Sequence, residues 1–202
     1  LKFRPNKNED PRTIPYGMHL SFMGILNQVA NYLDKVLIFT FIGSAQLATY
    51  SLAIAIPGSI QDIVKSIDIL AIPKLAVKSR EEIKLSIMKK VWKLFFLMVA
   101  VIILYVIAAP YIYKIFFPQY LNSIPYSQVF MLSFISLPAS LLGLAFRSKI
   151  MKRELYLLKI TPFIQVALLA ILVPFYGIWG AIIAIIGAEI FGTALTFFLF
   201  RK

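Results

Sequence analysis

The sequence predicts an all-α membrane protein, built as a bundle of six transmembrane helices with both termini in the cytoplasm. The first observation behind this prediction is composition: 60% of the 202 residues are hydrophobic and 15% are charged, and the mean hydropathy is +0.82. Soluble domains have about 45–50% apolar and about 25% charged residues. The second is that long apolar segments follow one another, each close to the roughly 20 residues that cross a bilayer as a helix. The third is that basic residues gather in alternate connections between these segments.

Composition also excludes several functions. The chain has no cysteine and a single histidine, His19, which excludes disulfides, thiolate catalysis and paired-histidine metal sites within this chain. It holds no His-Glu-x-x-His motif and no aspartate-rich cluster of the kind that membrane enzymes use, so we expect no enzymatic activity. The net charge is +12, but the basic residues lie at predicted membrane edges, so we expect no nucleic-acid partner.

Residues 1–13 are polar and basic, with prolines that disfavour helix, and they predict a cytoplasmic linker. The chain starts at Leu1, without a methionine or the pattern of a secretory signal, so we expect it to be a piece of a longer protein. Residues 14–202 then form the six-helix transmembrane lobe.

The first predicted span covers residues 16–41, and polar residues gather in its middle: Asn27, Gln28, Asn31, Asp34 and Lys35. Asn27, Asn31 and Asp34 are spaced i, i+4 and i+7, which places them on one helix face. A charge at the bilayer centre costs about 2.5–3.5 kcal/mol on insertion scales, so this face should avoid lipid. It either lines a water-filled cavity or forms a polar contact between helices, in which Asp34 pairs with a neighbouring cation.

The second predicted span, residues 45–72, contains Pro57-Gly58 near its middle, which predicts a kink. Its second half carries three charged residues: Asp62, Lys65 and Asp68. They form either a gate at the cytoplasmic mouth of a cavity or, the interpretation that we favour, a self-paired helix end whose long side chain reaches the interface. A basic amphipathic segment, residues 74–93, precedes the third span, residues 91–117. That span is almost free of polar groups, so we expect it to face lipid.

The fourth and fifth predicted spans, residues 125–146 and 155–173, carry proline kinks at Pro138 and Pro162. The basic connection between them includes Arg147 and Lys149, which we interpret as orientation charges. The sixth span covers residues 178–200, and small residues recur along it every four positions: Gly180, Ala184, Ala188 and Gly192. Such a ridge lets a neighbouring backbone approach closely. Glu189 lies on a second, polar face and either lines a cavity or hydrogen-bonds to another helix.

The basic residues predict the orientation. All but three of the 21 Lys and Arg residues lie in the N-terminal segment, in residues 74–93, in residues 147–159 or at the C-terminus; the exceptions are Lys35, Lys65 and Lys114. The two connections rich in basic residues alternate with connections that hold Lys114 alone. By the positive-inside rule, this predicts six crossings with both ends in the cytoplasm. We expect a multi-pass protein of the cytoplasmic membrane.

Four segments, in order, resemble the C-terminal half of polysaccharide-biosynthesis flippases, the O-antigen type of the MATE-related MOP superfamily. They are the polar stretch Asn31-Tyr32-Leu33-Asp34-Lys35-Val36-Leu37-Ile38, the turn and helix Gly43-Ser44-Ala45-Gln46-Leu47-Ala48-Thr49-Tyr50, Pro73 with the basic stretch after it, and Pro174-Phe175-Tyr176-Gly177-Ile178-Trp179-Gly180-Ala181. The resemblance covers nearly the whole chain and implies one lobe of a MATE-like two-lobe transporter. The other lobe would come from the same chain or from a second copy.

The resemblance further implies a translocase that moves a polyprenyl-pyrophosphate-linked oligosaccharide across the cytoplasmic membrane by alternating access. Its partners would be membrane lipid and the lipid-linked oligosaccharide. The cavity residues would be Asn27, Asn31, Asp34, Lys35 and Glu189, with Asp62, Lys65 and Asp68 as a cytoplasmic gate. Lys35 suits a phosphate group, no cofactor is implied, and coupling to H⁺ or Na⁺ through Asp34 stays open.

Two alternatives remain at this point. A MATE-type multidrug or cation exporter lobe would favour an acidic and aromatic lining, whereas Lys35 on the polar face favours an anionic head group. A structural membrane unit that transports nothing would keep its function after loss of the polar face.

Overall fold

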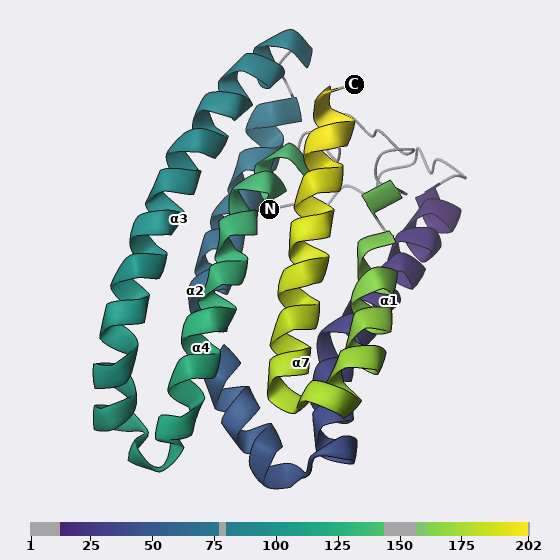
Figure 1. The fold of residues 1–202 in the computed structure, drawn as a ribbon. Helices are drawn as coiled ribbons and strands as arrows, with labels where there is room; N and C mark the ends of the chain where they lie inside the picture. Colours follow the sequence, from purple (N-terminus) through teal and green to yellow (C-terminus); the bar gives the residue numbers. More distant parts are fainter. Residues whose placement is uncertain (1–12, 77–79, 144–156, 159, 202) are drawn as a thin grey trace, which may run out of the picture.

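The computed structural model describes residues 13–76, 80–143, 157–158 and 160–201, and every element in these ranges is helical (Figure 1). The elements, in chain order, are α1 (Thr13–Phe41), α2 (Ser44–Ala76), α3 (Arg80–Phe116), η1 (Pro118–Ser123), α4 (Ile124–Met131), η2 (Leu132–Ala139) and α7 (Ile160–Arg201). The all-α prediction is confirmed for this part of the chain. The predicted linker up to residue 12 and the basic residues Arg147 and Lys149 lie outside it.

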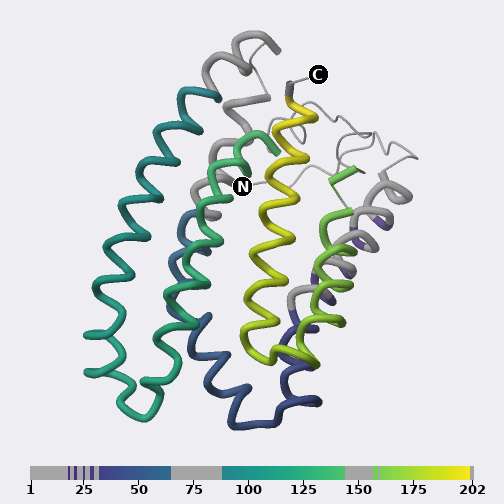
Figure 2. The backbone as a smooth tube through the Cα atoms, viewed as in Figure 1, coloured from purple at the N-terminus to yellow at the C-terminus, as the bar shows by residue number. Residues whose placement is uncertain are grey.

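The long helices run up and down side by side, as the backbone trace shows (Figure 2). The α1–α2 connection, η1 and a bend in α7 lie at one end of the bundle, and the C-terminal ends of α2 and α7 lie at the other. Helix α1 packs against α7 and α2, while α4 and η2 pack among α2, α3 and α7. Helix α3 lies at the edge of the bundle, which leaves one of its sides uncovered.

Two glycines with positive φ allow the chain to reverse at one end. Gly43 has φ 108°, and its N–H and that of Ile42 donate to the carbonyl of Ile38 at 3.1 and 2.9 Å, which caps the end of α1. Gly177 has φ 60° and ψ −132° and divides α7 into two helical segments. Only glycine adopts that conformation without strain, so the chain bends within α7 at this residue.

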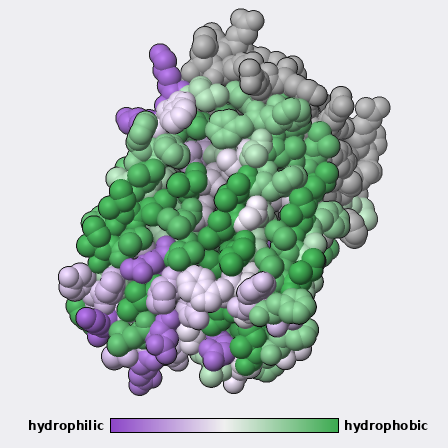
Figure 3. Space-filling view, viewed as in Figure 1, coloured by the Kyte–Doolittle hydropathy of each residue, from purple (hydrophilic) through white to green (hydrophobic). Residues whose placement is uncertain are grey.

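Four stretches of the described residues are long and apolar enough to cross a membrane: Ser44–Val64, Met88–Phe116, Pro118–Gly143 and Ile160–Phe200. The last of these holds the fifth predicted span from residue 160 onward and the whole of the sixth, on either side of Gly177. On the face that Figure 3 shows, hydrophobic side chains cover the middle, and hydrophilic ones gather mostly toward the lower end. The chain is therefore a multi-pass helical membrane protein; the number of six crossings and the cytoplasmic position of both ends stay predictions.

The core holds large side chains from α2, α3 and η2, among them the fully buried Tyr50, Tyr113 and Phe134. The small-residue ridge of α7 contributes to it, because Ala184 and Ala188 are buried. A Cβ atom on Gly180 would lie 2.2 Å from the carbonyl oxygen of Leu172, in the other segment of α7. The predicted close backbone approach along this ridge is confirmed.

Candidate functional site

Asp34 lies inside the bundle, in a contact between α1 and α2. It is 3% exposed, accepts a hydrogen bond from the hydroxyl of Tyr50, and its Oδ1 lies 2.7 Å from the backbone N–H of Lys35. Ile38, one turn further along α1, is fully buried on the same face. This contact matches the second interpretation of the polar face in the sequence, a polar contact between helices. Its described partner is a tyrosine, whereas that interpretation expected a cation.

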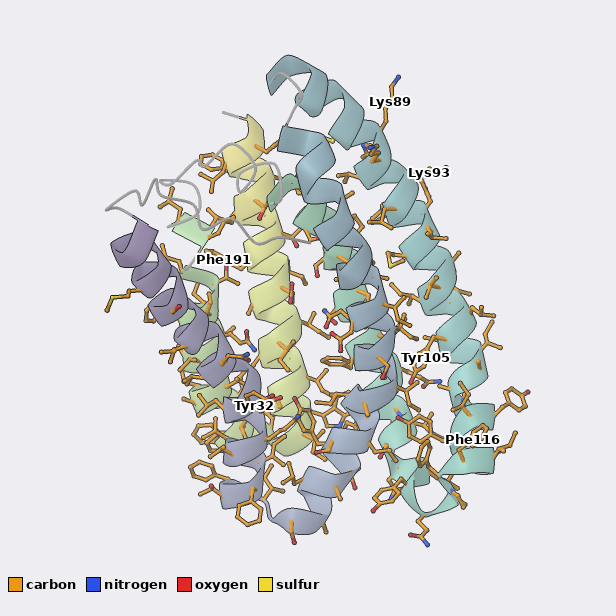
Figure 4. All side chains as sticks on the ribbon, turned by 180° about the vertical axis from the view of Figure 1, so that it is seen from behind. Tyr32, Lys89, Lys93, Tyr105, Phe116 and Phe191 are labelled. Atoms are coloured by element: carbon orange, nitrogen blue, oxygen red, sulfur yellow. The ribbon has the colours of Figure 1, made fainter. Side chains whose placement is uncertain are left out.

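Lys35 points away from Asp34, because consecutive helix positions differ by about 100°. Its side chain is half-buried, and its Nζ lies 5.4 Å from the centre of the Tyr32 ring. This is the distance of a cation–π contact. Tyr32 is exposed on the outer side of α1 (Figure 4), so the ammonium group lies on that side as well.

Lys35 and Tyr32 belong to a line of exposed or half-exposed residues, which we call the α1 outer stripe: Ser21, Ile25, Gln28, Tyr32, Lys35 and Phe39. Their alternating spacing of four and three places all six on one helix face. Polar side chains occupy every seventh position of the stripe, at Ser21, Gln28 and Lys35. Because polar groups are costly to bury in hydrocarbon, this face calls for water or another protein surface beside it.

The polar face predicted from the sequence is therefore not the α1 outer stripe but a neighbouring face of the same helix. Asn27 and Asn31 lie on α1 with Asp34, but their side chains lie outside the described part of the structure, so their lining role stays a prediction. Ser21 and Tyr32 were not singled out from the sequence, and Gln28 was included only among the polar residues in the middle of the span. The seven-residue repeat of polar positions is the signal that relates Ser21 and Gln28 to Lys35.

Glu189 forms a second polar contact, between α7 and η2. Its side chain is half-buried, and its Oε2 lies 3.1 Å from the hydroxyl oxygen of Ser136. That hydroxyl also lies 2.6 Å from the carbonyl of Ser133, so its single proton is shared between two acceptors. The sequence allowed two roles for Glu189, a cavity lining or a hydrogen bond to another helix. The structure contains the hydrogen bond.

The contact lies at an irregular point of the fourth predicted span. Residues 132–139 form a 3₁₀ helix that contains Pro138, whose ring nitrogen donates no hydrogen bond. A 3₁₀ stretch within a longer helix often marks a hinge. Glu189 therefore binds α7 to the part of the bundle where helical geometry changes.

The predicted gate residues are only partly described. Asp62 is exposed on α2, and Lys65 and Asp68 follow on the same helix, but the side chains of the latter two lie outside the described part. Both the gate and the self-paired helix end stay predictions. Among the described side chains, no group of three His, Cys, Asp or Glu residues gathers as metal ligands.

A polar seam holds α2, α3 and α4 together. The hydroxyls of Tyr105 and Ser127 lie 2.5 Å apart, and the Gln128 amide donates to the Val106 carbonyl at 2.9 Å. Two further bonds reach α2: from Tyr113 of α3 to the Leu52 carbonyl at 3.0 Å and from Ser123 of η1 to the Thr49 carbonyl at 2.9 Å. Gln128 serves in helix packing, and the seam makes the three helices one unit. The Asp34–Tyr50 bond joins α1 to α2, and the Glu189–Ser136 bond joins α7 to η2, which follows α4 directly.

Comparison with known families supplies a match over residues 2–125, to the family described as polysaccharide biosynthesis protein. The match begins before α1 and ends in the first turn of α4. It therefore includes the α1 outer stripe, Asp34 and Tyr50. Comparisons with curated proteins and with solved structures returned no match.

Proposed function

The chain belongs to the polysaccharide biosynthesis protein family, and from this we propose that it is one lobe of a membrane translocase. Its substrate is a polyprenyl-pyrophosphate-linked oligosaccharide, which it moves across the cytoplasmic membrane toward the outer leaflet. The lobe performs no covalent chemistry: it shelters a polar head group from hydrocarbon while the polyprenyl tail stays in lipid.

The observation that carries the proposal is the α1 outer stripe, because on a helix of a membrane bundle it leaves Ser21 and Gln28 exposed and Lys35 half-exposed. A face of this kind is unsuited to acyl chains. We assign it to a hydrated cavity between this lobe and a second one, supplied by the same chain or by another copy.

Each polar group of the stripe suits one part of the substrate. The Lys35 ammonium suits the pyrophosphate, since charge-assisted hydrogen bonds to phosphate oxygens are strong. The amide of Gln28 and the hydroxyl of Ser21 suit sugar hydroxyls, as both donors and acceptors. Asn27 and Asn31 extend this lining in the proposal, and Asp62, Lys65 and Asp68 form its cytoplasmic gate.

Alternating access requires parts of the lobe to move relative to each other. The polar seam makes α2, α3 and α4 one unit, so the movable contacts in the proposal are Asp34–Tyr50 and Glu189–Ser136. In both, a hydroxyl donates to a carboxyl group, and exchange of H⁺ or Na⁺ at Asp34 would couple movement to an ion gradient.

Replacement of Lys35 tests the proposal. Lys35→Ala should reduce the export of lipid-linked sugar by about tenfold or more, since it removes a charged hydrogen-bond donor from the pyrophosphate, and Lys35→Arg should retain much of it. Export is measured from sugar that accumulates on the lipid carrier in cells that lack any other translocase. Lys114→Ala, on an exposed lysine of α3, is the matched control. Normal export by the Lys35→Ala protein would remove the phosphate contact from the proposal.

Cysteine labelling tests the cavity separately, because the natural chain has no cysteine. Gln28→Cys and Ile107→Cys place a thiol at positions that are both exposed on the lobe. A water-soluble maleimide should react with the first and spare the second, because the thiolate forms only in water. Equal protection of both positions would mean that the stripe faces lipid or a dry contact, and the translocase proposal would fail. Efflux of cationic drugs without export of lipid-linked sugar would instead identify a multidrug exporter.

A further inference from the structure

Helix α3 is longer than a bilayer requires. Its 37 residues, Arg80–Phe116, extend about 55 Å at 1.5 Å per residue, compared with about 30 Å of hydrocarbon. From Leu94 to Tyr113 it carries no charged residue. This apolar part fills the hydrocarbon layer, so the residues just before Leu94 lie at the level of the lipid head groups.

Basic and aromatic residues meet at this boundary, and we call them the basic-aromatic end of α3: Lys89, Lys90, Trp92, Lys93 and Phe96. All five are exposed, with Trp92 at 56% and Phe96 at 65%. Figure 4 shows Lys89 and Lys93 pointing away from the bundle. The inward side of the same two turns is apolar, because Val91 and Met98 are 4% and 3% exposed. The cations and the rings thus occupy the uncovered side of α3.

The aromatic rings form a packed group next to the lysines. The ring centres of Trp92 and Phe95 lie 5.7 Å apart in an edge-to-face arrangement, and so do those of Phe95 and Phe96. Trp92 and Phe96 are 6.1 Å apart. Tryptophan prefers the membrane interface, so the group fixes the depth at which Lys89 and Lys93 lie.

Few acidic residues lie near these cations in the sequence. No Asp or Glu occurs from Ile83 to Arg153, a stretch that covers α3 beyond its first turn, η1, α4 and η2. Three lysines within two helical turns therefore produce a local positive field beside the lipid. The complementary partner is an anion at head-group depth whose tail contacts Trp92 and Phe96.

We propose that the basic-aromatic end of α3 is a binding site for anionic phospholipids, with the phosphate of the head group on Lys89 and Lys93. The side of α3 that carries it faces away from the bundle, so the site is separate from the α1 outer stripe. Phospholipid of the surrounding leaflet reaches this side by lateral diffusion, which is why we assign it to bulk lipid and not to the transported substrate. The inference does not depend on the proposed function.

Tryptophan fluorescence tests the site directly, because the chain has two tryptophans. Trp179 packs on Tyr126 at 4.8 Å and follows the bend at Gly177, at the opposite end of the bundle from Lys89. The Trp179→Phe protein reports from Trp92 alone, and the Trp92→Phe protein reports from Trp179 alone. Each is reconstituted in mixed vesicles in which either phosphatidylglycerol or phosphatidylcholine carries brominated chains that quench on contact.

The expected result is a preference of the Trp92 site for phosphatidylglycerol over phosphatidylcholine of about threefold or more, which decreases as salt is raised. Lys89→Gln combined with Lys93→Gln should reduce the preference to near one, whereas Lys114→Gln, at the other end of the same helix, should leave it unchanged. The Trp179 site should show no comparable preference. Equal quenching by the two lipids at Trp92, or a preference that survives the double replacement, would overturn the proposal.

Discussion

Asp34 shows how a single residue in this bundle depends on one partner. The carboxyl group is almost fully buried, and its described hydrogen bonds come from the Tyr50 hydroxyl and the Lys35 backbone. An unsatisfied polar group away from water is costly, and more so in a membrane protein. The stability of the α1–α2 contact should therefore depend on the Tyr50 hydroxyl.

We expect Tyr50→Phe to destabilise the protein by about 1–2 kcal/mol, because it removes the hydroxyl and leaves the carboxyl without that donor. The measurement is unfolding in mixed micelles of increasing denaturing detergent. In the background of Asp34→Asn the same replacement should cost less, and the difference between the two costs gives the coupling energy of the pair.

Tyr111→Phe is the control, because Tyr111 is 67% exposed on α3 and loses the same oxygen atom. Its effect should be within about 0.5 kcal/mol of zero. Equal effects of the two tyrosine replacements would show that the bond between Tyr50 and Asp34 contributes nothing to stability.

The sequence pattern singles out Asp34 and Lys35 but does not predict the directions in which their side chains point. Both lie in one polar cluster, and a periodicity argument cannot decide which of two adjacent faces turns inward. The deciding group is Tyr50, 16 residues further along and on another helix. It carries no periodic signal of its own, so the inward position of Asp34 depends on the tertiary contact.

At the scale of helices, a close approach lies within α7, where Gly180 faces the backbone of the segment before the bend. A Cβ at this position would lie 2.2 Å from the Leu172 carbonyl oxygen and 2.5 Å from its carbon. Both are backbone atoms, which cannot rotate away as a side chain does. The two segments of α7 must therefore separate if position 180 carries any side chain.

Gly180→Ala should accordingly destabilise the protein by about 1–3 kcal/mol through overpacking. Gly58→Ala is the matched control on α2, because a Cβ there meets nothing within 4 Å and alanine is the better helix former by about 0.8–1 kcal/mol. The two replacements should thus change the unfolding midpoint in opposite directions. A neutral Gly180→Ala protein would contradict the observed packing of the ridge.

Some features of the helices could be predicted from the sequence and others could not, and the difference has a physical cause. The turns at Gly43 and Gly177 were predictable because glycine interrupts apolar runs where the backbone needs positive φ. The 3₁₀ geometry of residues 132–139 was not, since Pro138 predicts a kink without its form. The Glu189–Ser136 contact that accompanies it joins residues 53 positions apart, which helical spacing does not relate.

At the scale of the whole molecule, the lobe combines a fixed part with attached helices. Four hydrogen bonds of hydroxyl or amide groups link α2, α3, η1 and α4, whereas the described bonds from α1 and α7 to this part involve carboxyl groups. Carboxyl contacts respond to protons and ions, and hydroxyl–carbonyl contacts do not. This distribution of bonds is the physical basis for placing movement at α1 and α7 in the proposed transport cycle.

The predicted orientation of the lobe is testable because the natural chain lacks cysteine, so each introduced thiol reports alone. Asn122 in η1 and Phe175 before the α7 bend are exposed and lie at one end of the bundle, while Lys89 lies at the other. With both termini in the cytoplasm, Asn122→Cys and Phe175→Cys should react with a membrane-impermeant maleimide added to intact cells. Lys89→Cys should react only after the cells are permeabilised.

Phe175→Cys is the informative member of this set, since its position depends on the bend at Gly177. If residues 160–176 and 178–201 cross the bilayer as two separate spans, the thiol at position 175 lies outside the cell, as does the thiol at position 122. The lobe then has an even number of membrane crossings. If the two segments of α7 do not each cross, residue 175 remains on the side of Lys89 or within the lipid, and its thiol escapes the external reagent. Labelling of Lys89→Cys from outside would instead reverse the whole lobe and contradict the positive-inside assignment.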